Sequence, residues 1–219
     1  MSFNQIFKKE IINLTKYKII NCHAGKLPFY RGRNILNWVL INGESEFGIT
    51  VHYVDEGIDT GDIISQEAHS ITDTDNYSTL LLRSYSECAN ILYKAVSLFK
   101  NGRAIGKKQS DIYPTSFYCT QRKIGDEKIN WNDTSREIFN FIRSICRPAP
   151  MASAFINSKE VKINSAELVK DAIMYKCIIG AILNIDETGF LVKTGDNFIK
   201  ITEYSTNFKL KIGDRFDLK

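Results

Sequence analysis

The sequence predicts an α/β domain followed by a small β domain, and two patterns of apolar residues indicate this. In the first half, short apolar runs alternate with amphipathic stretches in the order strand, helix, strand, strand, long helix. After about residue 150 the chain changes to short apolar segments separated by Asn, Gly and Asp, which is typical of a small β-barrel or sandwich. The 219 residues are enough for one large domain or two small ones.

The elements of the first half follow from local patterns. "KYKIINCH" predicts a strand that ends at about Cys22 and is buried on both faces, and "NILNWVLINGE" predicts a helix that ends at a glycine. "FGITVHYVD" and "GDIISQEAHSI" predict two further strands. A long helix follows, and its predicted apolar stripe is Leu81, Tyr85, Cys88, Leu92, Val96 and Phe99.

A long connection and a second helix separate the two halves. Residues 101–128 carry six Lys or Arg against three acidic residues. Thr134 and Glu137 have capping-box spacing, and the helix after them has an apolar stripe made of Ile138, Phe141, Ile142 and Ile145. We therefore expect a first domain over residues 1–128, a connecting helix over 129–150 and a small barrel-like (OB-like) domain over 151–219.

Composition sets broad limits on function. The net charge of +4 is mild and does not by itself indicate nucleic-acid binding. Five scattered cysteines without a CxxC pair favour buried, reduced thiols and no metal site. Because no apolar run approaches the ~18 residues needed to cross a bilayer, we expect a soluble cytoplasmic protein.

Asn21 and His23 stand at the end of the first predicted strand, where α/β proteins commonly bind ligands. Side chains two residues apart point to the same face of a strand, so the carboxamide and the imidazole should lie together. Such a pair suits reactions at a carbonyl group, because the amide can hold a developing oxyanion while the imidazole moves protons.

A carboxylate is needed to orient the imidazole, and "DEGIDTGDI" after the second strand offers Asp55, Glu56, Asp59 and Asp62. We expect such a carboxylate to raise the pKa of His23. The set would support acyl or formyl transfer without a covalent enzyme intermediate, since the chain has no GxSxG motif. A structural histidine is the alternative for His23, and we interpret His52 and His69 as structural.

The stretch "NCHAGKLPFYRG", followed by "NWVLINGESEFGITVHYVDEGIDTGDII", resembles the signature of formyltransferases that use 10-formyltetrahydrofolate. Weaker similarity continues through "KINW" and "ICRPAPMASAFINSKEVKI" to "LKIGDRF". The group includes methionyl-tRNA, glycinamide ribonucleotide and sugar formyltransferases. The resemblance implies a Rossmann-like catalytic domain with a small appended β-barrel, and the catalytic residues Asn21, His23 and Asp59.

The resemblance also implies a pterin pocket and a mechanism. One wall of the pocket would be Gln5, Ile6 and Phe7, and the other Asp55, Glu56, Gly57 and Ile58, largely through main-chain groups. An amine would attack the formyl carbon directly while Asn21 and a protonated His23 stabilise the oxyanion. Asp59 would orient His23 and accept the proton of the amine.

Two departures from the family pattern stand out. Gly25-Lys26-Leu27-Pro28 replaces the usual Ser-Leu-Leu-Pro, and Lys26 is either solvated or in contact with a substrate phosphate. Only twenty residues precede Asn21, where the family has a further α/β segment. Without that segment we expect an open sheet edge and marginal stability, and interpret the chain as a fragment, a product of internal initiation, or a chain that pairs with another copy or partner.

Two classes of amine compete as the acceptor. Residues 151–219 have ten Lys or Arg and nine acidic residues, so their charges nearly balance and they are poorly suited to bind the phosphates of tRNA. Asn34 and Asn37-Trp38 resemble the sugar enzymes, and Lys26, Arg31 or Arg33 could meet a diphosphate. We therefore favour a nucleotide-linked amino sugar, with methionyl-tRNA and an inactive folate-binding or interaction fragment as alternatives, and consider a homodimer compatible with the sequence.

Overall fold

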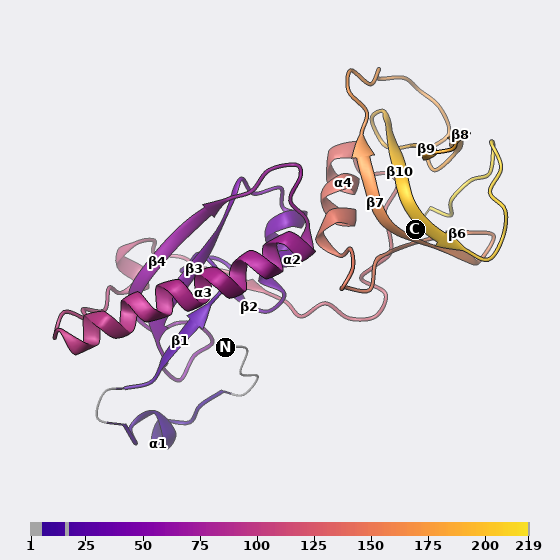
Figure 1. Cartoon of the computed structure of the whole chain (residues 1–219). Helices are drawn as coiled ribbons and strands as arrows, with labels where there is room; N and C mark the ends of the chain where they lie inside the picture. The colour runs from indigo at the N-terminus through magenta and orange to yellow at the C-terminus, as the bar shows by residue number, and fades with distance from the viewer. Residues whose placement is uncertain (1–5, 16–17, 219) are drawn as a thin grey trace. The chain divides into compact units, whose positions relative to one another are not determined.

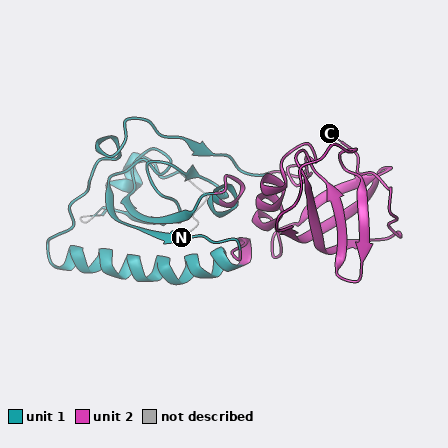
Figure 2. Cartoon of the chain, turned by 90° about the horizontal axis from the view of Figure 1, so that it is seen from above, with its two compact units in different colours: residues 1–39, 44–73, 79–122 teal, residues 40–43, 74–78, 123–219 magenta. Residues whose placement is uncertain are grey.

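The computed structural model describes residues 6–15 and 18–218, and divides the chain into two compact units. The first unit comprises residues 1–39, 44–73 and 79–122, and the second comprises 40–43, 74–78 and 123–219 (Figure 2). Short pieces of the first half of the sequence thus belong to the second unit. The residues predicted to carry the chemistry lie in the first unit.

The first unit is built on an antiparallel sheet with the strand order β1-β3-β4 (Figure 1). A second, parallel pair joins β2 to β5. The elements of this half, some of which continue into the second unit, are α1 (Lys9–Ile12), β1 (Ile20–His23), β2 (Arg31–Gly32), α2 (Ile35–Ile41), β3 (Glu46–Tyr53), β4 (Ile63–Ser70), α3 (Tyr77–Lys100), the 3₁₀ turn η1 (Gln109–Asp111) and β5 (Tyr118–Cys119).

Helix α3 packs along this sheet and contacts all three strands, since Phe99 also packs on Tyr53 of β3 with ring centroids 5.9 Å apart. The Sγ of Cys22 on β1 lies 3.7 Å from the carbonyl oxygen of Cys88, and Lys94 pairs with Glu67 on β4 at 2.8 Å. The buried side chains of the helix are Leu80, Ser84, Cys88, Ile91 and Ala95. The prediction of the buried face was therefore wrong: the observed face is rotated about the helix axis by about one residue from the predicted stripe. Two members of the predicted stripe, Tyr85 and Val96, are 59% and 45% exposed.

The second unit contains a five-stranded antiparallel sheet with the order β6-β7-β10-β9-β8. The C-terminal segment joins its two outer strands, because Asp217 N–H donates to Phe155 of β6 and Ile182 N–H of β8 donates to Asp214. This half of the chain contains α4 (Ser135–Ser144), β6 (Ala152–Ile156), β7 (Lys159–Leu168), β8 (Ile182–Asp186), β9 (Gly189–Lys193) and β10 (Phe198–Thr206).

The core of the second unit is a cluster of buried apolar side chains. Trp131 is fully buried and stacks on Phe216, with ring centroids 4.8 Å apart. The predicted capping box at the start of α4 is confirmed, since Thr134 accepts from Glu137 N–H while the Glu137 side chain accepts from Thr134 N–H. All five cysteines are free thiols, but Cys177 is exposed and Cys119 is only partly buried, so the expectation of buried thiols was wrong for these two.

Of the residues that the structure describes, none belongs to a helix that is both long and apolar enough to span a membrane.

Candidate active site

The pairing of β1 with β3 assembles the polar groups of the site. Asn21 lies directly opposite His52, and His23 lies opposite Thr50. Side chains that face each other across an antiparallel pair point to the same side of the sheet. The register of β3 with β4 shifts between Val51 and His52, and a shift of this kind next to a site re-aims a side chain.

One carboxylate links the polar groups of the site. Asp59 Oδ2 lies 3.6 Å from His23 Nδ1, and Asp59 Oδ1 lies 3.5 Å from His52 Nε2. The same His52 nitrogen lies 3.3 Å from Asn21 Nδ2. The structure therefore brings Asn21, His23 and Asp59 together, with His52 as the bridge between the carboxamide and the carboxylate.

The ring of His23 is held on both of its nitrogen atoms. His23 Nε2 lies 2.7 Å from the carbonyl oxygen of Tyr30, which can only accept, so Nε2 carries a proton. Gly25 makes this position available: a Cβ there would lie 2.4 Å from His23 Nε2 and 2.5 Å from the Tyr30 carbonyl oxygen. The glycine that departs from the family pattern is thus in contact with the candidate catalytic imidazole.

Asp59 lies in a strained turn that other residues hold in place. Its φ is +54°, a left-handed conformation that Asp tolerates better than most residues. The buried Gln109 side chain donates through Nε2 to the carbonyl oxygens of Asp59 and Gly61, both at 2.8 Å. Gly32 N–H donates to Asp59 Oδ2 at 3.0 Å, which fixes the carboxylate as well as the backbone.

The protonation states follow from burial and from these contacts. Burial lowers the pKa of His23, and this outweighs the raising effects of the Asp59 carboxylate and of the Tyr30 carbonyl. Burial alone would raise the pKa of Asp59, but the neighbouring His52 ring, the charge of His23 and the Gly32 N–H bring it down to about 2. The prediction of a raised His23 pKa was therefore wrong, because desolvation disfavours the imidazolium more than the carboxylate favours it.

The three cationic residues predicted to meet a substrate are engaged within the protein. Arg31 donates through Nε and Nη2 to Gln109 Oε1, at 3.1 and 2.6 Å, and through Nη1 to Ser116. Lys26 forms an ion pair with Glu46, and Arg33 Nη1 donates to Gln121 at 3.4 Å. Arg31 is thus a structural link to the residue that holds the Asp59 turn.

The residues predicted to line a pterin pocket differ in how accessible they are to a ligand. Gln5 lies outside the described residues, Ile6 is 63% exposed and Phe7 is half-buried. The carboxylate of Asp55 accepts from Gly57 N–H and from the Thr60 hydroxyl, so it closes the turn. Exposed residues of the turn are Glu56, Gly57 and Ile58.

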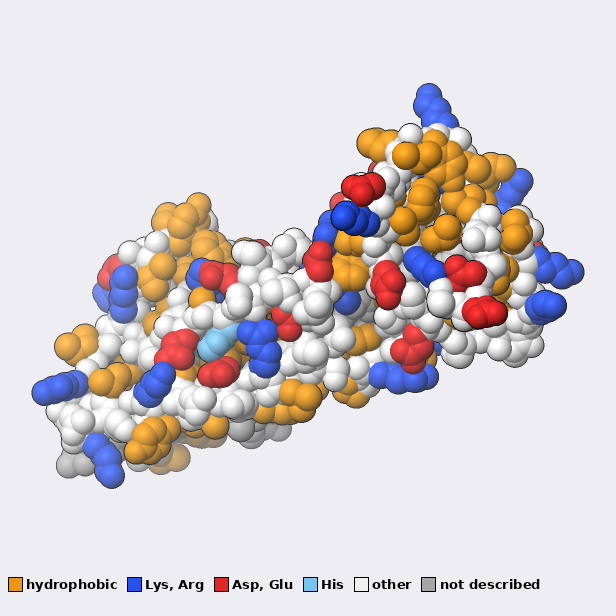
Figure 3. Space-filling view, turned by 45° about the horizontal axis from the view of Figure 1, so that its top comes forward, with side chains coloured by type: hydrophobic (Ala, Val, Ile, Leu, Met, Phe, Trp, Pro, Cys, Tyr) orange, Lys and Arg blue, Asp and Glu red, His pale blue; other side chains and the backbone are white. Residues whose placement is uncertain are grey.

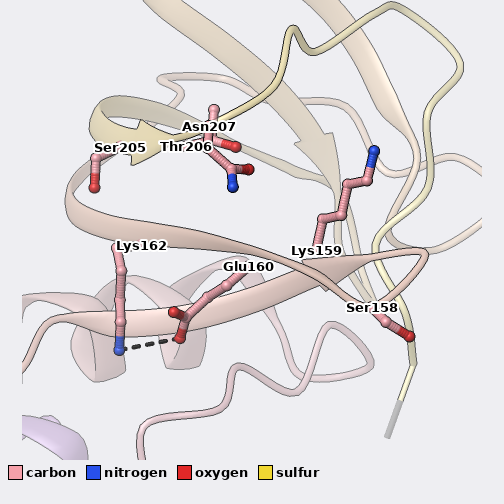
Figure 4. Close-up of a pocket in the computed structure, with 7 residues that line it drawn as sticks. All are labelled: Ser158, Lys159, Glu160, Lys162, Ser205, Thr206 and Asn207. Atoms are coloured by element: carbon pink, nitrogen blue, oxygen red, sulfur yellow. Dashed lines mark ion pairs between the residues drawn. The ribbon is translucent and has the colours of Figure 1, made fainter.

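Two other places in the described chain could attract a small ligand or ion. A hollow in the second unit is lined by residues of β7 and β10 and their connections, and includes the Lys162–Glu160 ion pair at 3.2 Å (Figure 4). Glu67, His69 and Glu87 place ligand atoms within 4.8 Å of one another, but Glu67 already pairs with Lys94 at 2.8 Å. Neither group includes the residues around Asp59.

Sequence reasoning missed two residues of the site. His52 was interpreted as structural, and Gln109 was not singled out. The sequence places His52 on a predicted strand, seven residues before Asp59. This position indicates a role in the site only when it is known that the strand of His52 pairs with the strand of Asn21. Gln109 stands in the irregular segment 101–128, where no local pattern pointed to Asp59.

The fold and the site define an α/β protein with an appended β domain and a carboxamide, two imidazoles and a carboxylate in contact. The sequence matches two family models, "Formyl transferase" over residues 1–96 and "Formyl transferase, C-terminal domain" over residues 123–213. A methionyl-tRNA formyltransferase from Halothermothrix orenii is 34% identical over 223 residues, covering 100% of this chain and 70% of the relative. This chain belongs to the formyl transferase family.

Other relatives and solved structures agree with this. The methionyl-tRNA formyltransferase of Fusobacterium nucleatum is 36% identical over 203 residues, and the chain spans only 64% of its length. An N-formyltransferase from Helicobacter canadensis, in complex with folinic acid and dTDP-3-aminofucose, superposes with a TM-score of 0.74 at 29% identity, covering 93% of this chain and 72% of the other. The sugar 3N-formyl transferase WlaRD, in the presence of dTDP and 5-N-formyl-THF, gives 0.70 at 30% identity, with 95% and 71% covered.

Proposed function

We propose that this chain transfers a formyl group from 10-formyltetrahydrofolate to a primary amine, and that Asn21, His23 and Asp59 are the catalytic residues. The observation that carries the proposal is the contact of one carboxylate with two imidazoles, at 3.6 and 3.5 Å, beside the Asn21 amide. The proposal includes a catalytic domain over residues 1–128, a connecting helix over 129–150 and a terminal β domain over 151–219.

The chain offers surfaces for the formyl donor, which supplies an electrophilic one-carbon carbonyl group when bound. The Asp55 carboxylate is used inside its own turn, whereas Glu56, Gly57 and Ile58 are exposed directly before Asp59. These residues can therefore meet a flat pterin through their main-chain groups. Ile6 and Phe7 would form the other wall.

The protonation states assign a role to each catalytic group. Asn21 has two amide N–H groups, and the one not directed to His52 can donate to the formyl oxygen as negative charge develops there. His23 is neutral at neutral pH because burial lowers its pKa, and since its Nε2 already carries a proton, its Nδ1 is the atom that can accept the proton lost by the attacking amine. The Asp59 carboxylate, 3.6 Å away, would stabilise the imidazolium until that proton passes to the leaving nitrogen.

We propose a nucleotide-linked amino sugar as the acceptor. In support, the two similar structures at 29% and 30% identity are an N-formyltransferase with dTDP-3-aminofucose and a sugar 3N-formyl transferase with dTDP. Residues 151–219 have ten Lys or Arg and nine acidic residues, and on the face drawn in Figure 3 both charge types are interspersed among apolar side chains. A surface of this kind is a poor match for the phosphates of tRNA.

Methionyl-tRNA is the second candidate acceptor, because the relatives at 33–37% identity are methionyl-tRNA formyltransferases. Asn34 and Trp38, whose resemblance to the sugar enzymes favoured an amino sugar, also have intramolecular partners. Asn34 Oδ1 accepts from Arg122 N–H at 2.9 Å, and Trp38 Nε1 donates to Thr120 at 2.9 Å. The choice between the acceptors therefore needs a direct assay.

The experiment compares formylation of a dTDP-linked amino sugar with formylation of methionyl initiator tRNA, using 10-formyltetrahydrofolate. We expect turnover with the sugar, and a large fall in kcat, with residual turnover, in Asn21→Ala, His23→Ala and Asp59→Ala with retained circular dichroism. A His23→Ala protein with nearly unchanged kcat would refute the catalytic assignment. Thermal stabilisation by folinic acid without any turnover would instead identify an inactive folate-binding chain. If both stabilisation and turnover are absent, the chain is an interaction fragment.

A further inference from the structure

His52 is a buried histidine that touches two of the three proposed catalytic residues. It is 2% exposed, and its Nε2 lies 3.3 Å from Asn21 Nδ2 and 3.5 Å from Asp59 Oδ1. Its ring centroid lies 6.4 Å from that of His23, with the ring planes at 84°. The ionisable groups that face it are thus Asp59 and His23.

The other ring nitrogen of His52 fixes its tautomer. Nδ1 lies 2.7 Å from the carbonyl oxygen of Tyr53, and a carbonyl oxygen only accepts, so Nδ1 carries a proton. In a neutral ring Nε2 is then an acceptor, and the nearby donor is the amide of Asn21. Asn21 and His52 face each other across β1 and β3, so both ends of this contact are set by strand pairing.

We propose that His52 is a positioning residue that holds the Asn21 carboxamide in the orientation needed for formyl transfer. Neutral His52 accepts one amide N–H of Asn21, which leaves the second N–H for the formyl oxygen. A proton on Nε2 would instead point to Asp59 and leave the Asn21 amide without this acceptor. This inference rests on the proposed function for its kinetic part, and on geometry alone for its tautomer part.

The kinetic test is a double-mutant cycle between His52 and Asn21. We expect His52→Phe to lower kcat about 10- to 100-fold in the wild-type background. In the Asn21→Ala background it should change kcat less than about 3-fold, because the group it positions is gone. His52→Gln, which can place an amide oxygen near the same point, should recover part of the loss. Equal effects of His52→Phe in both backgrounds would overturn the proposal.

A matched control is available on the neighbouring strand. His69 on β4 packs on Phe47, with ring centroids 5.2 Å apart, and its Nε2 is buried without a partner among the described residues. His69→Phe should therefore leave kcat within about 3-fold of wild type. If it lowers kcat as much as His52→Phe does, general loss of packing explains both results and the positioning role is rejected.

The tautomer test does not depend on turnover. The chain has three histidines, so ¹⁵N-histidine NMR with His→Phe variants assigns each ring. At pH near 7 we expect the Nδ1–H tautomer for His52 and the Nε2–H tautomer for His23. An Nε2–H tautomer or an imidazolium at His52 would overturn the proposal even in an inactive protein. Absence of turnover combined with the expected tautomers would reject the proposed function and leave the His52–Asn21 contact established.

Discussion

Gln109→Ala should loosen the turn that carries Asp59, since this side chain makes four hydrogen bonds from a position only 4% exposed. Its Nε2 donates to the carbonyl oxygens of Asp59 and Gly61 at 2.8 Å. Its Oε1 accepts from Nε and Nη2 of Arg31 at 3.1 and 2.6 Å. One side chain therefore links the turn after β3 to the loop after β1.

The expected cost comes mainly from the two carbonyl groups. Leaving a buried acceptor unsatisfied costs about 1–3 kcal/mol, and the two carbonyls differ in burial, so we expect a loss of about 2–4 kcal/mol in the free energy of unfolding. The guanidinium of Arg31 is partly exposed, and water can replace its lost bonds at little cost. The strained backbone of Asp59 would relax, and kcat should fall at least about 10-fold because small displacements of catalytic groups are costly.

The assay is urea unfolding followed by the fluorescence of Trp38, with Trp131→Phe as the common background so that only the first unit is observed. Gln121→Ala is the matched control, since Gln121 is exposed and accepts a single long bond from Arg33 at 3.4 Å. We expect it to change stability by less than about 0.5 kcal/mol. If Gln109→Ala destabilises the first unit no more than Gln121→Ala does, the reasoning about the turn is refuted.

Three further outcomes can be measured. Gly25→Ala should lower kcat about 10- to 100-fold while thermal stabilisation by folinic acid persists, because a Cβ would lie 2.4 Å from His23 Nε2; an unchanged kcat would show that the ring tolerates displacement. Because the pKa of His23 is lowered in the folded state, the unfolded state binds a proton at a higher pH than the folded state does, so the free energy of unfolding should fall as pH drops below about 6.5. His23→Phe should remove this dependence of the unfolding free energy on pH, measured by urea titrations. Thr134→Ala should cost the second unit about 1 kcal/mol in thermal unfolding through loss of the cap on Glu137 N–H, and no change would argue against that cap.

Local rules were sufficient for part of the site. The two-residue repeat of a strand placed Asn21 and His23 on one face, and the Gly-punctuated turn after β3 offered Asp59 as one of four acidic residues, from which the family resemblance selected it. Both predictions depend on short segments whose geometry is set by neighbours in sequence. Gln109 could not be found this way, because its role depends on contacts with Asp59 and Gly61, 50 and 48 residues earlier in the chain.

The buried face of α3 shows a different limit. Apolar residues occur on several sides of this helix, so the predicted stripe and the observed one share Cys88 but differ by about one residue elsewhere. Side chains such as Leu82 and Tyr93 remain 68% and 77% exposed. A helix with so broad an apolar distribution does not encode its own orientation, and packing against the sheet decides which side is buried.

The protonation of His23 is the point where an apparently sound local argument gave the opposite answer. A nearby carboxylate does favour an imidazolium, but that effect competes with the loss of hydration, and the sequence reveals the neighbour without revealing the burial. In the folded chain His23 is 8% exposed, and burial is the larger effect. The consequence is chemical: a neutral imidazole beside an ionised Asp59 starts the reaction as a proton acceptor. The task of stabilising the formyl oxygen then falls on the Asn21 amide, which makes the orientation of that amide by His52 more consequential.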